Sequence, residues 1–151
     1  MTPTAPMELA LQAAREAAAR GEVPVGAVVT GPDGGVLAVA GNETEADHDA
    51  TAHAEMLALR RAAATTGSTR LVGCTLWVTL EPCPMCATAA ALFRVKRLIF
   101  GAYDPKGGGV DHGPRIFANS RNLHCPEVIG GMLESHASLL LRAFFVAKRI
   151  D

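Results

Sequence analysis

The stretch Thr75-Leu76-Trp77-Val78-Thr79-Leu80-Glu81-Pro82-Cys83-Pro84-Met85-Cys86 joins a strand pattern directly to a helix pattern. Residues 75–80 form a short β-rich run of the kind found in the middle of a sheet. Pro82 then stands where a proline is well tolerated, at the first turn of a helix that also contains the small apolar run Ala87 to Phe93. We therefore expect a central strand that leads into a helix bearing two thiols.

The rest of the chain alternates between helix and strand patterns. Further helices are predicted over Met7–Arg20, from Thr51 or Ala52 to the stop at Gly67, and from about Leu133 to Arg149. Further strands are predicted over Val25–Thr30, Val36–Ala40, Arg97–Ala102 and Glu127–Ile129. The segment Tyr103–Pro126 has little periodicity and is predicted to be a long functional loop. This order of elements predicts an α/β layered sheet with helices on both faces.

Length and charge limit the function classes. A chain of 151 residues fits one domain, 1–151, with a real hydrophobic core. Its net charge of −1 excludes a general nucleic-acid coat protein, so any contact with a polyanion has to be a local patch. The N-terminus has no signal-peptide pattern, and no apolar run approaches the roughly 18 residues of a membrane span. These features predict a soluble cytoplasmic protein without a membrane partner.

Two short segments contain the residues suited to metal chemistry, His53-Ala54-Glu55 and Cys83-Pro84-Met85-Cys86, each at a predicted helix N-terminus. Two thiolates and one imidazole give zinc three protein ligands and leave the fourth position for water, the pattern of a catalytic site. Zinc-bound water becomes nucleophilic near neutral pH, and Glu55 is the candidate proton carrier. On an ideal helix Glu55 would point about 200° away from His53, so His53 has to lie at the non-helical entry or first turn.

The sequence also allows other roles for the cysteines. A lone Cys-x-x-Cys is commonly a redox pair or half of a structural zinc site, which here would recruit Cys74 and Cys125. That structural site leaves His53, Glu55 and Pro82 unexplained. The combination of His-x-Glu followed by Pro-Cys-x-x-Cys is the signature of zinc deaminases.

The sequence resembles the cytidine deaminase-like zinc deaminases, and within them the bacterial tRNA adenosine deaminases. The resemblance covers nearly the whole chain. Beyond the metal segments it includes Glu22–Val28, Gly41-Asn42, His48–Glu55, Val78–Cys83, Gly101–Lys106 and Phe144-Phe145.

The resemblance implies a three-layer α/β/α fold with a mixed sheet of about five strands, and a homodimer. It implies one Zn²⁺ per chain on His53, Cys83 and Cys86, with Glu55 as the proton shuttle. Asn42 and the backbone of Ala54 would hold the edge of the base, and Asp104 would contact the target ribose. The implied reaction is deamination of wobble adenosine to inosine in a tRNA anticodon stem-loop.

Departures from the family pattern leave an alternative substrate open. Tyr103 stands where many members have arginine, the C-terminus is less basic, and residues 107–127 differ from the commonest version. These changes favour the rival hypothesis of a small nucleobase substrate, namely a free base or nucleoside such as guanine, cytosine or cytidine. A structural zinc or RNA-binding module without turnover is a further alternative.

The remaining glycine, aromatic, histidine and basic residues are predicted to have structural roles or leave two roles open. Gly107-Gly108-Gly109 is predicted to be a flexible loop and not a phosphate-binding loop. Trp77 is most simply a core residue, and the small-residue helix 87–91 suits either a dimer interface or the core. Surface or locally bonded positions are expected for His112, His124 and His136, and phosphate contacts are considered for Arg94, Lys96, Arg97, Lys148 and Arg149.

Overall fold

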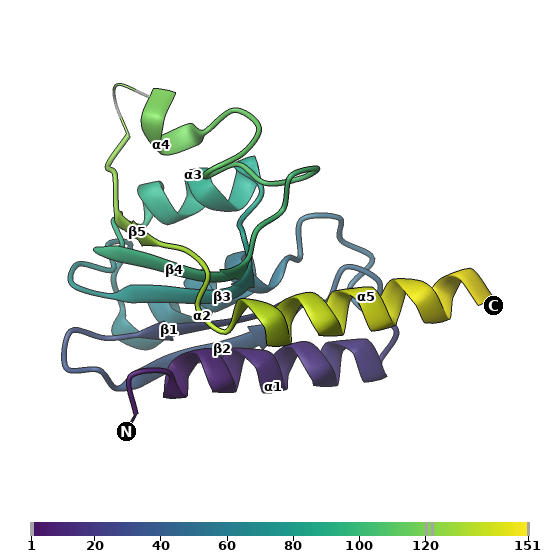
Figure 1. Cartoon of the computed structure of the whole chain (residues 1–151). Helices are drawn as coiled ribbons and strands as arrows, with labels where there is room; N and C mark the ends of the chain where they lie inside the picture. The colour runs from purple at the N-terminus through teal and green to yellow at the C-terminus, as the bar shows by residue number, and fades with distance from the viewer. Residues whose placement is uncertain (1, 120, 122, 151) are drawn as a thin grey trace.

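Five strands form one mixed sheet in the order β2-β1-β3-β4-β5 in the computed structural model (Figure 1), which describes residues 2–119, 121 and 123–150. Met1, Ser120, Asn122 and Asp151 lie outside the described residues; Ser120 and Asn122 belong to the predicted loop 103–126. The strands are β1 (Gly26–Thr30), β2 (Val36–Gly41), β3 (Thr75–Leu80), β4 (Arg97–Ala102) and β5 (Glu127–Ile129). The central position predicted for residues 75–80 is confirmed.

The directions of the strands bring the carboxyl ends of β3 and β4 to the same edge of the sheet. β1 runs antiparallel to both β2 and β3, whereas β3, β4 and β5 run parallel to one another. A parallel pair needs a crossover connection, and helix α3 (Pro84–Leu92) supplies it between β3 and β4. The carboxyl ends of β3 and β4 therefore lie at the same edge, where open α/β sheets commonly bind ligands.

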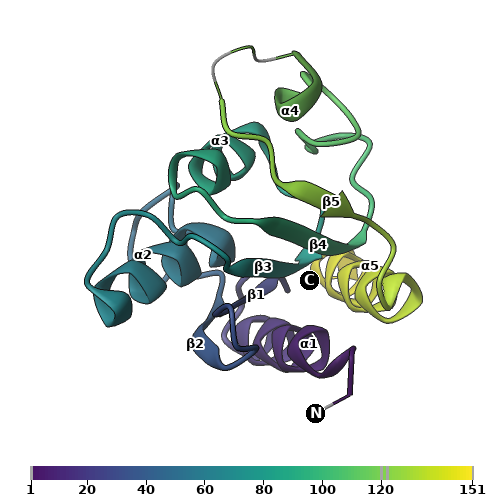
Figure 2. The same cartoon turned by 90° about the vertical axis from the view of Figure 1, so that its left-hand side faces the viewer.

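Helices cover both faces of the sheet, which confirms the three-layer prediction (Figures 1 and 2). The helices α1 (Ala5–Ala19) and α5 (Glu134–Ile150) pack on one face, and α2 (Ala54–Thr66) and α3 pack on the other. No helix of the described part of the chain is long and apolar enough to cross a bilayer.

The strand pleat divides the core between these two layers. Val28 and Ile99 pack with Met7 and Ala10 of α1, while the neighbouring side chains of β1, β3 and β4 join the larger cluster under α2 and α3. Helix α1 approaches β1 closely, because a Cβ on Gly26 would collide with the carbonyl oxygen of Ala10. Trp77, predicted to be a core residue, is partly buried against the cluster on the same face and donates from Nε1 to Thr30 Oγ1 at 2.9 Å.

Most element boundaries differ from the sequence predictions by one or two residues, and the starts of the two helices next to the metal segments differ in a way that matters for the site. Helix α2 begins at Ala54 and not at Thr51 or Ala52, because Asp49 Oδ1 accepts hydrogen bonds from both N and Oγ1 of Thr51 and holds a turn there. Helix α3 begins at Pro84, not at Pro82. The long loop contains a four-residue helix, α4 (Ile116–Asn119), which the lack of periodicity concealed.

Candidate metal centre

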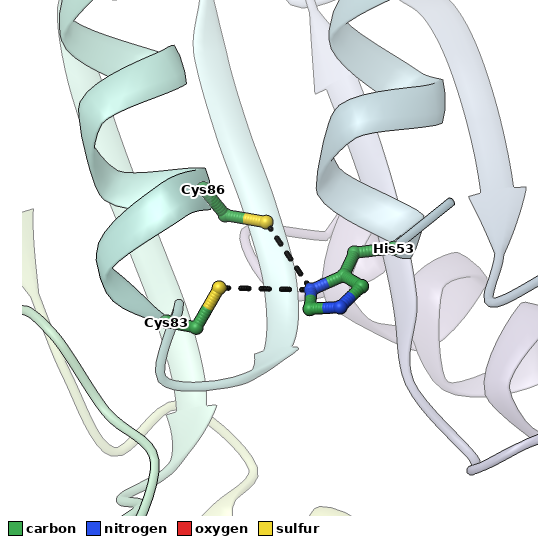
Figure 3. A group of neighbouring side chains, drawn as sticks. All are labelled: His53, Cys83 and Cys86. Carbon is green, nitrogen blue, oxygen red and sulfur yellow. Dashed lines mark hydrogen bonds between the residues drawn. The ribbon is translucent and has the colours of Figure 1, made fainter. Parts of the chain in front are cut away.

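His53 is the residue that immediately precedes helix α2. Its backbone is extended (φ −71°, ψ 150°), so it lies outside the helical rotation that relates its neighbours. This position agrees with the prediction, because His53 and Glu55 can serve one site only if His53 lies outside the regular helix. The imidazole is half-buried and points toward the start of α3 (Figure 3).

Cys83 occupies the corresponding position before helix α3, again with extended backbone (φ −68°, ψ 170°). Cys86 lies in the first turn of that helix, and its side chain is buried. Both sulfurs face His53 (Figure 3). The positive end of the helix dipole at this terminus favours the thiolate form of both cysteines.

The three donor atoms have the spacing of a tetrahedral zinc site. His53 Nδ1 lies 3.6 Å from Cys83 Sγ and 3.6 Å from Cys86 Sγ, and all three donors fall within 4.8 Å of one another. A zinc ion bonded to sulfur at about 2.3 Å and to nitrogen at about 2.05 Å at the tetrahedral angle separates those ligand atoms by about 3.6 Å. The residues present therefore fit zinc, with one coordination position left for another ligand.

The neighbouring thiols of Cys83 and Cys86 shift each other's pKa in opposite directions. A hydrogen bond from the Cys86 thiol, opposed by burial and assisted by His53, lowers the pKa of Cys83 to about 4. The same hydrogen bond, together with burial, raises the pKa of Cys86. A metal ion binding to both sulfurs has to displace the proton of the Cys86 thiol, so metal affinity at this site should fall as pH is lowered.

The metal group, formed by His53, Cys83 and Cys86, borders a cavity of about 330 Å³, which we call the metal cavity. Glu55 forms part of the wall of this cavity. Glu55 is in the first turn of α2 and is 4% exposed. Burial raises the pKa of Glu55 to about 7. A carboxyl group in this setting can both accept and return a proton near neutral pH.

Asn42 and Ala54 are joined by a hydrogen bond on another wall of the cavity. Asn42 Oδ1 accepts from the backbone N–H of Ala54 at 2.8 Å, which fixes the side-chain amide. Asn42 lines the cavity, whereas Ala54 lies behind it and is fully buried. The backbone N–H of Ala54 is therefore engaged within the chain, and the predicted contact of the Ala54 backbone with a base stays a prediction.

Asp104 lies in the segment that follows β4, beside the metal cavity. Its Oδ1 accepts from the backbone N–H groups of Lys106 and Gly107 at 3.2 and 3.0 Å. Its own N–H donates to Glu81 Oε1 at 3.0 Å. Glu81 is a site residue for which the sequence predicts no role; its one sequence signal is a glutamate next to the metal segment in the stretch Val78–Cys83.

A second cavity of about 680 Å³ adjoins the first. The two share Val23, Leu80 and Asp104 in their walls, so Asp104 stands at their boundary. The larger cavity is otherwise lined by aromatic and basic side chains together with apolar ones, including Tyr103 and Phe145 and also Lys106, Arg142 and Arg149.

The four-cysteine structural site is not formed. Cys74 precedes β3 and Cys83 follows it, and a strand of that length separates its ends by about 20 Å. Among the described residues, His53, Cys83 and Cys86 are the one group of three or more potential ligands close enough to hold a metal ion.

The basic residues that the sequence offers for phosphate contacts do not lie together in one patch. Arg149 lines the second cavity, while Lys148 Nζ lies 5.5 Å from the Phe144 ring centroid. Arg97 is paired with Glu127 at 2.9 Å. Arg94 and Lys96 lie just before β4, at the other end of the sheet, where they line a separate cavity.

Comparison with known proteins identifies relatives along nearly the whole chain. The zinc-binding region of cytidine and deoxycytidylate deaminases matches residues 2–102. A tRNA-specific adenosine deaminase from Agrobacterium fabrum is 50% identical over 145 residues, which is 96% of this chain and 95% of that protein.

Solved structures agree with the sequence relatives. A structure from a study of A-to-I editing by tRNA:A34 deaminases at the wobble position has a TM-score of 0.89 and 48% identity, covering 91% of this chain and 99% of that one. A guanine deaminase from Nitrosomonas europaea has a TM-score of 0.84 at 26% identity, covering 96% of this chain and 85% of that one.

We expect the wild-type chain to bind one zinc ion, and Cys83→Ala or Cys86→Ala to lose it, because two ligands hold the metal far more weakly than three. The matched controls are Cys74→Ala and Cys125→Ala, which remove free cysteines outside the metal group. Elemental analysis of the purified chains measures the metal content. Loss of zinc in either control, or its retention in both ligand variants, would contradict the ligand set.

Proposed function

Because this chain belongs to the cytidine and deoxycytidylate deaminase family, in the branch of the tRNA-specific adenosine deaminases, we propose that it converts wobble adenosine to inosine in a tRNA anticodon loop. The observation that carries this proposal is a base-sized cavity with the metal group and Glu55, joined at Asp104 to a larger aromatic and basic cavity. Two joined cavities suit a substrate in which the reacting base is still linked to a polynucleotide: the smaller cavity takes the base and the larger one takes its neighbour.

Hydrolytic deamination adds water to C6 of adenine and releases ammonia from the same carbon. The chemistry that a zinc ion supplies when bound to His53, Cys83 and Cys86 is activation of a water molecule near neutral pH. Glu55 takes the proton that water loses on attack and delivers it to the departing amino group. Its burial beside the metal group and its raised pKa support both halves of this transfer.

Asn42 is proposed to hold the edge of the base. The Ala54 N–H fixes Oδ1 of Asn42 and thereby directs the amide NH₂ group to the cavity as a hydrogen-bond donor. Purine ring nitrogens accept hydrogen bonds, so this donor suits a purine. Ala54 then contributes by orienting Asn42, and its predicted direct contact with the base stays a prediction.

The second cavity is proposed to take a nucleotide next to the target. Tyr103 and Phe145 offer aromatic faces or edges for a base, and Lys106, Arg142 and Arg149 offer cations for phosphates. A local patch of this kind reconciles an RNA substrate with a net charge of −1. The position of Asp104 at the boundary of the cavities supports its proposed contact with the sugar that joins the two nucleotides.

The Glu55→Gln variant is expected to keep its zinc and to lose deaminase activity on an anticodon stem-loop by about a hundredfold or more, because the amide cannot carry the proton. Inosine formation under saturating substrate, together with zinc analysis, measures both properties. Glu45→Gln, which changes an exposed glutamate in a neighbouring loop, is the control and should retain activity. Full activity of Glu55→Gln would overturn the proton-transfer role.

A free base or nucleoside is the second candidate substrate, favoured by the likeness to a guanine deaminase and by the base-sized first cavity. The two candidates differ in whether the second cavity matters. Under the RNA proposal, the wild-type chain deaminates the stem-loop and leaves guanine, cytosine and cytidine unchanged.

Phe145→Ala is then expected to raise KM for the stem-loop by about tenfold, since a stacked base is worth about 1–3 kcal/mol. Leu139→Ala is the matched control, because Leu139 is exposed on the same helix and lies outside both cavities. Activity confined to free bases, with Phe145→Ala equal to wild type, would establish the alternative.

A homodimer acting in the cytoplasm, the compartment of tRNA, completes the proposal. Ala87, Ala89, Ala90 and Ala91 do not support a dimer, because they are buried in the core of the chain itself. Two exposed apolar side chains offer better support: Val72 and Leu92 flank the backbone hydrogen bond from Leu71 N to Phe93 O. Light scattering should give twice the 15.7 kDa chain mass, and a monomer mass at micromolar concentration would contradict the dimer.

A further inference from the structure

The buried carboxylate of Glu81 is within hydrogen-bond distance of five nitrogen atoms. Its Oε1 accepts from the backbone N–H of Asp104 at 3.0 Å and is 2.8 Å from His112 Nδ1. Its Oε2 accepts from the backbone N–H groups of Val110, Asp111 and His112 at 3.0 to 3.2 Å. One side chain thus ties both ends of segment 104–112 to the end of β3.

The segment is packed tightly around this carboxylate, which corrects the prediction of a flexible glycine loop. Gly108 and Gly109 are buried. A Cβ on Gly108 would collide with Glu81 Oε2, and a Cβ on Gly109 would lie 2.5 Å from the backbone nitrogen of Pro84. Glycine is required here because the loop backbone approaches Glu81 and the start of α3 too closely for a side chain.

The residues held by this packing form the walls of both cavities. Asp104 and Gly107 line the metal cavity, and Asp104 and Lys106 line the second one. The Asp104 N–H is bound to Glu81, while the Asp104 side chain caps the turn at Lys106 and Gly107. The position of this boundary therefore depends on Glu81.

We propose that Glu81 is a positioning residue that sets the boundary between the two cavities by holding Asp104, and thereby determines how tightly a polynucleotide substrate binds. The inference rests on the proposed function. Glu81 exposes none of its side chain and both carboxylate oxygens are engaged, so it acts through Asp104 and does not transfer protons itself. Its loss should weaken substrate binding and leave the chemical step largely intact.

Glu81→Gln tests this arrangement with little change in shape. When the amide oxygen takes the place of Oε2, it keeps the three backbone donors there, and the amide NH₂ group then faces the Asp104 N–H without an acceptor. We expect KM for the anticodon stem-loop to rise by about tenfold, kcat to change by less than about twofold, and zinc content to stay at the wild-type level.

A double-mutant cycle with Asp104→Ala separates positioning from a general structural role. If Glu81 acts through Asp104, the double variant should have a KM within about twofold of Asp104→Ala alone. Glu22→Gln is the matched control, because Glu22 is also a buried glutamate that accepts hydrogen bonds from a loop, namely from Thr44, Glu45 and Ala46. Its effect on KM should multiply with that of Asp104→Ala.

If the effects of Glu81→Gln and Asp104→Ala on KM multiply in an active enzyme, Glu81 does not act through Asp104. Loss of zinc and of kcat at unchanged KM would also overturn the positioning role. Neither result would overturn the proposed function. A wild-type chain without activity on the stem-loop would overturn the proposed function as well. Should Glu81→Gln yield no folded protein, Glu81→Asp, which keeps the charge on a shorter side chain, enters the same cycle with the same criteria.

Discussion

His53 and Cys83 each stand one residue before a helix, with extended backbone, and the geometry of the metal group depends on these two positions. Helices α2 and α3 lie on one face of the sheet (Figure 2), so the residues at their N-termini can approach each other (Figure 3). Each residue of a helix turns the side chain by about 100°, so a helix that began one turn earlier would direct His53 elsewhere. The short Asp49 turn prevents that earlier start.

The walls of the site depend on a second physical constraint, the need to satisfy buried charge. Glu22 and Glu81 are both almost fully buried, and backbone N–H groups of adjacent loops supply their hydrogen bonds. Burial alone raises the pKa of each carboxyl, but these hydrogen bonds outweigh it and hold both pKa values below the ordinary range. An ionised carboxylate inside the protein thus organises a loop that has no hydrophobic periodicity of its own.

The regular elements were predictable because each depends on residues close together in the chain. The strand 75–80 and the helix from Met7 onward follow from β-rich and amphipathic patterns, and the structure confirms both with small shifts of boundary. The order of segment 104–112 was not predictable, because it arises from hydrogen bonds between Glu81 and residues 23 to 31 positions away. No local pattern reports a contact at that separation.

The chemical groups of the site follow directly from the sequence: one imidazole, two thiols three residues apart, and a carboxyl group two residues after the histidine. Helix-start signals also placed the two metal segments at helix N-termini. Three further features depend on the packing of distant segments: His53 Nδ1 lies near both sulfurs, the Ala54 N–H donates to Asn42, and Asp104 lies between two cavities. The physical reason is that spacing rules act within one helix or strand, whereas these contacts depend on how the sheet packs separate segments together.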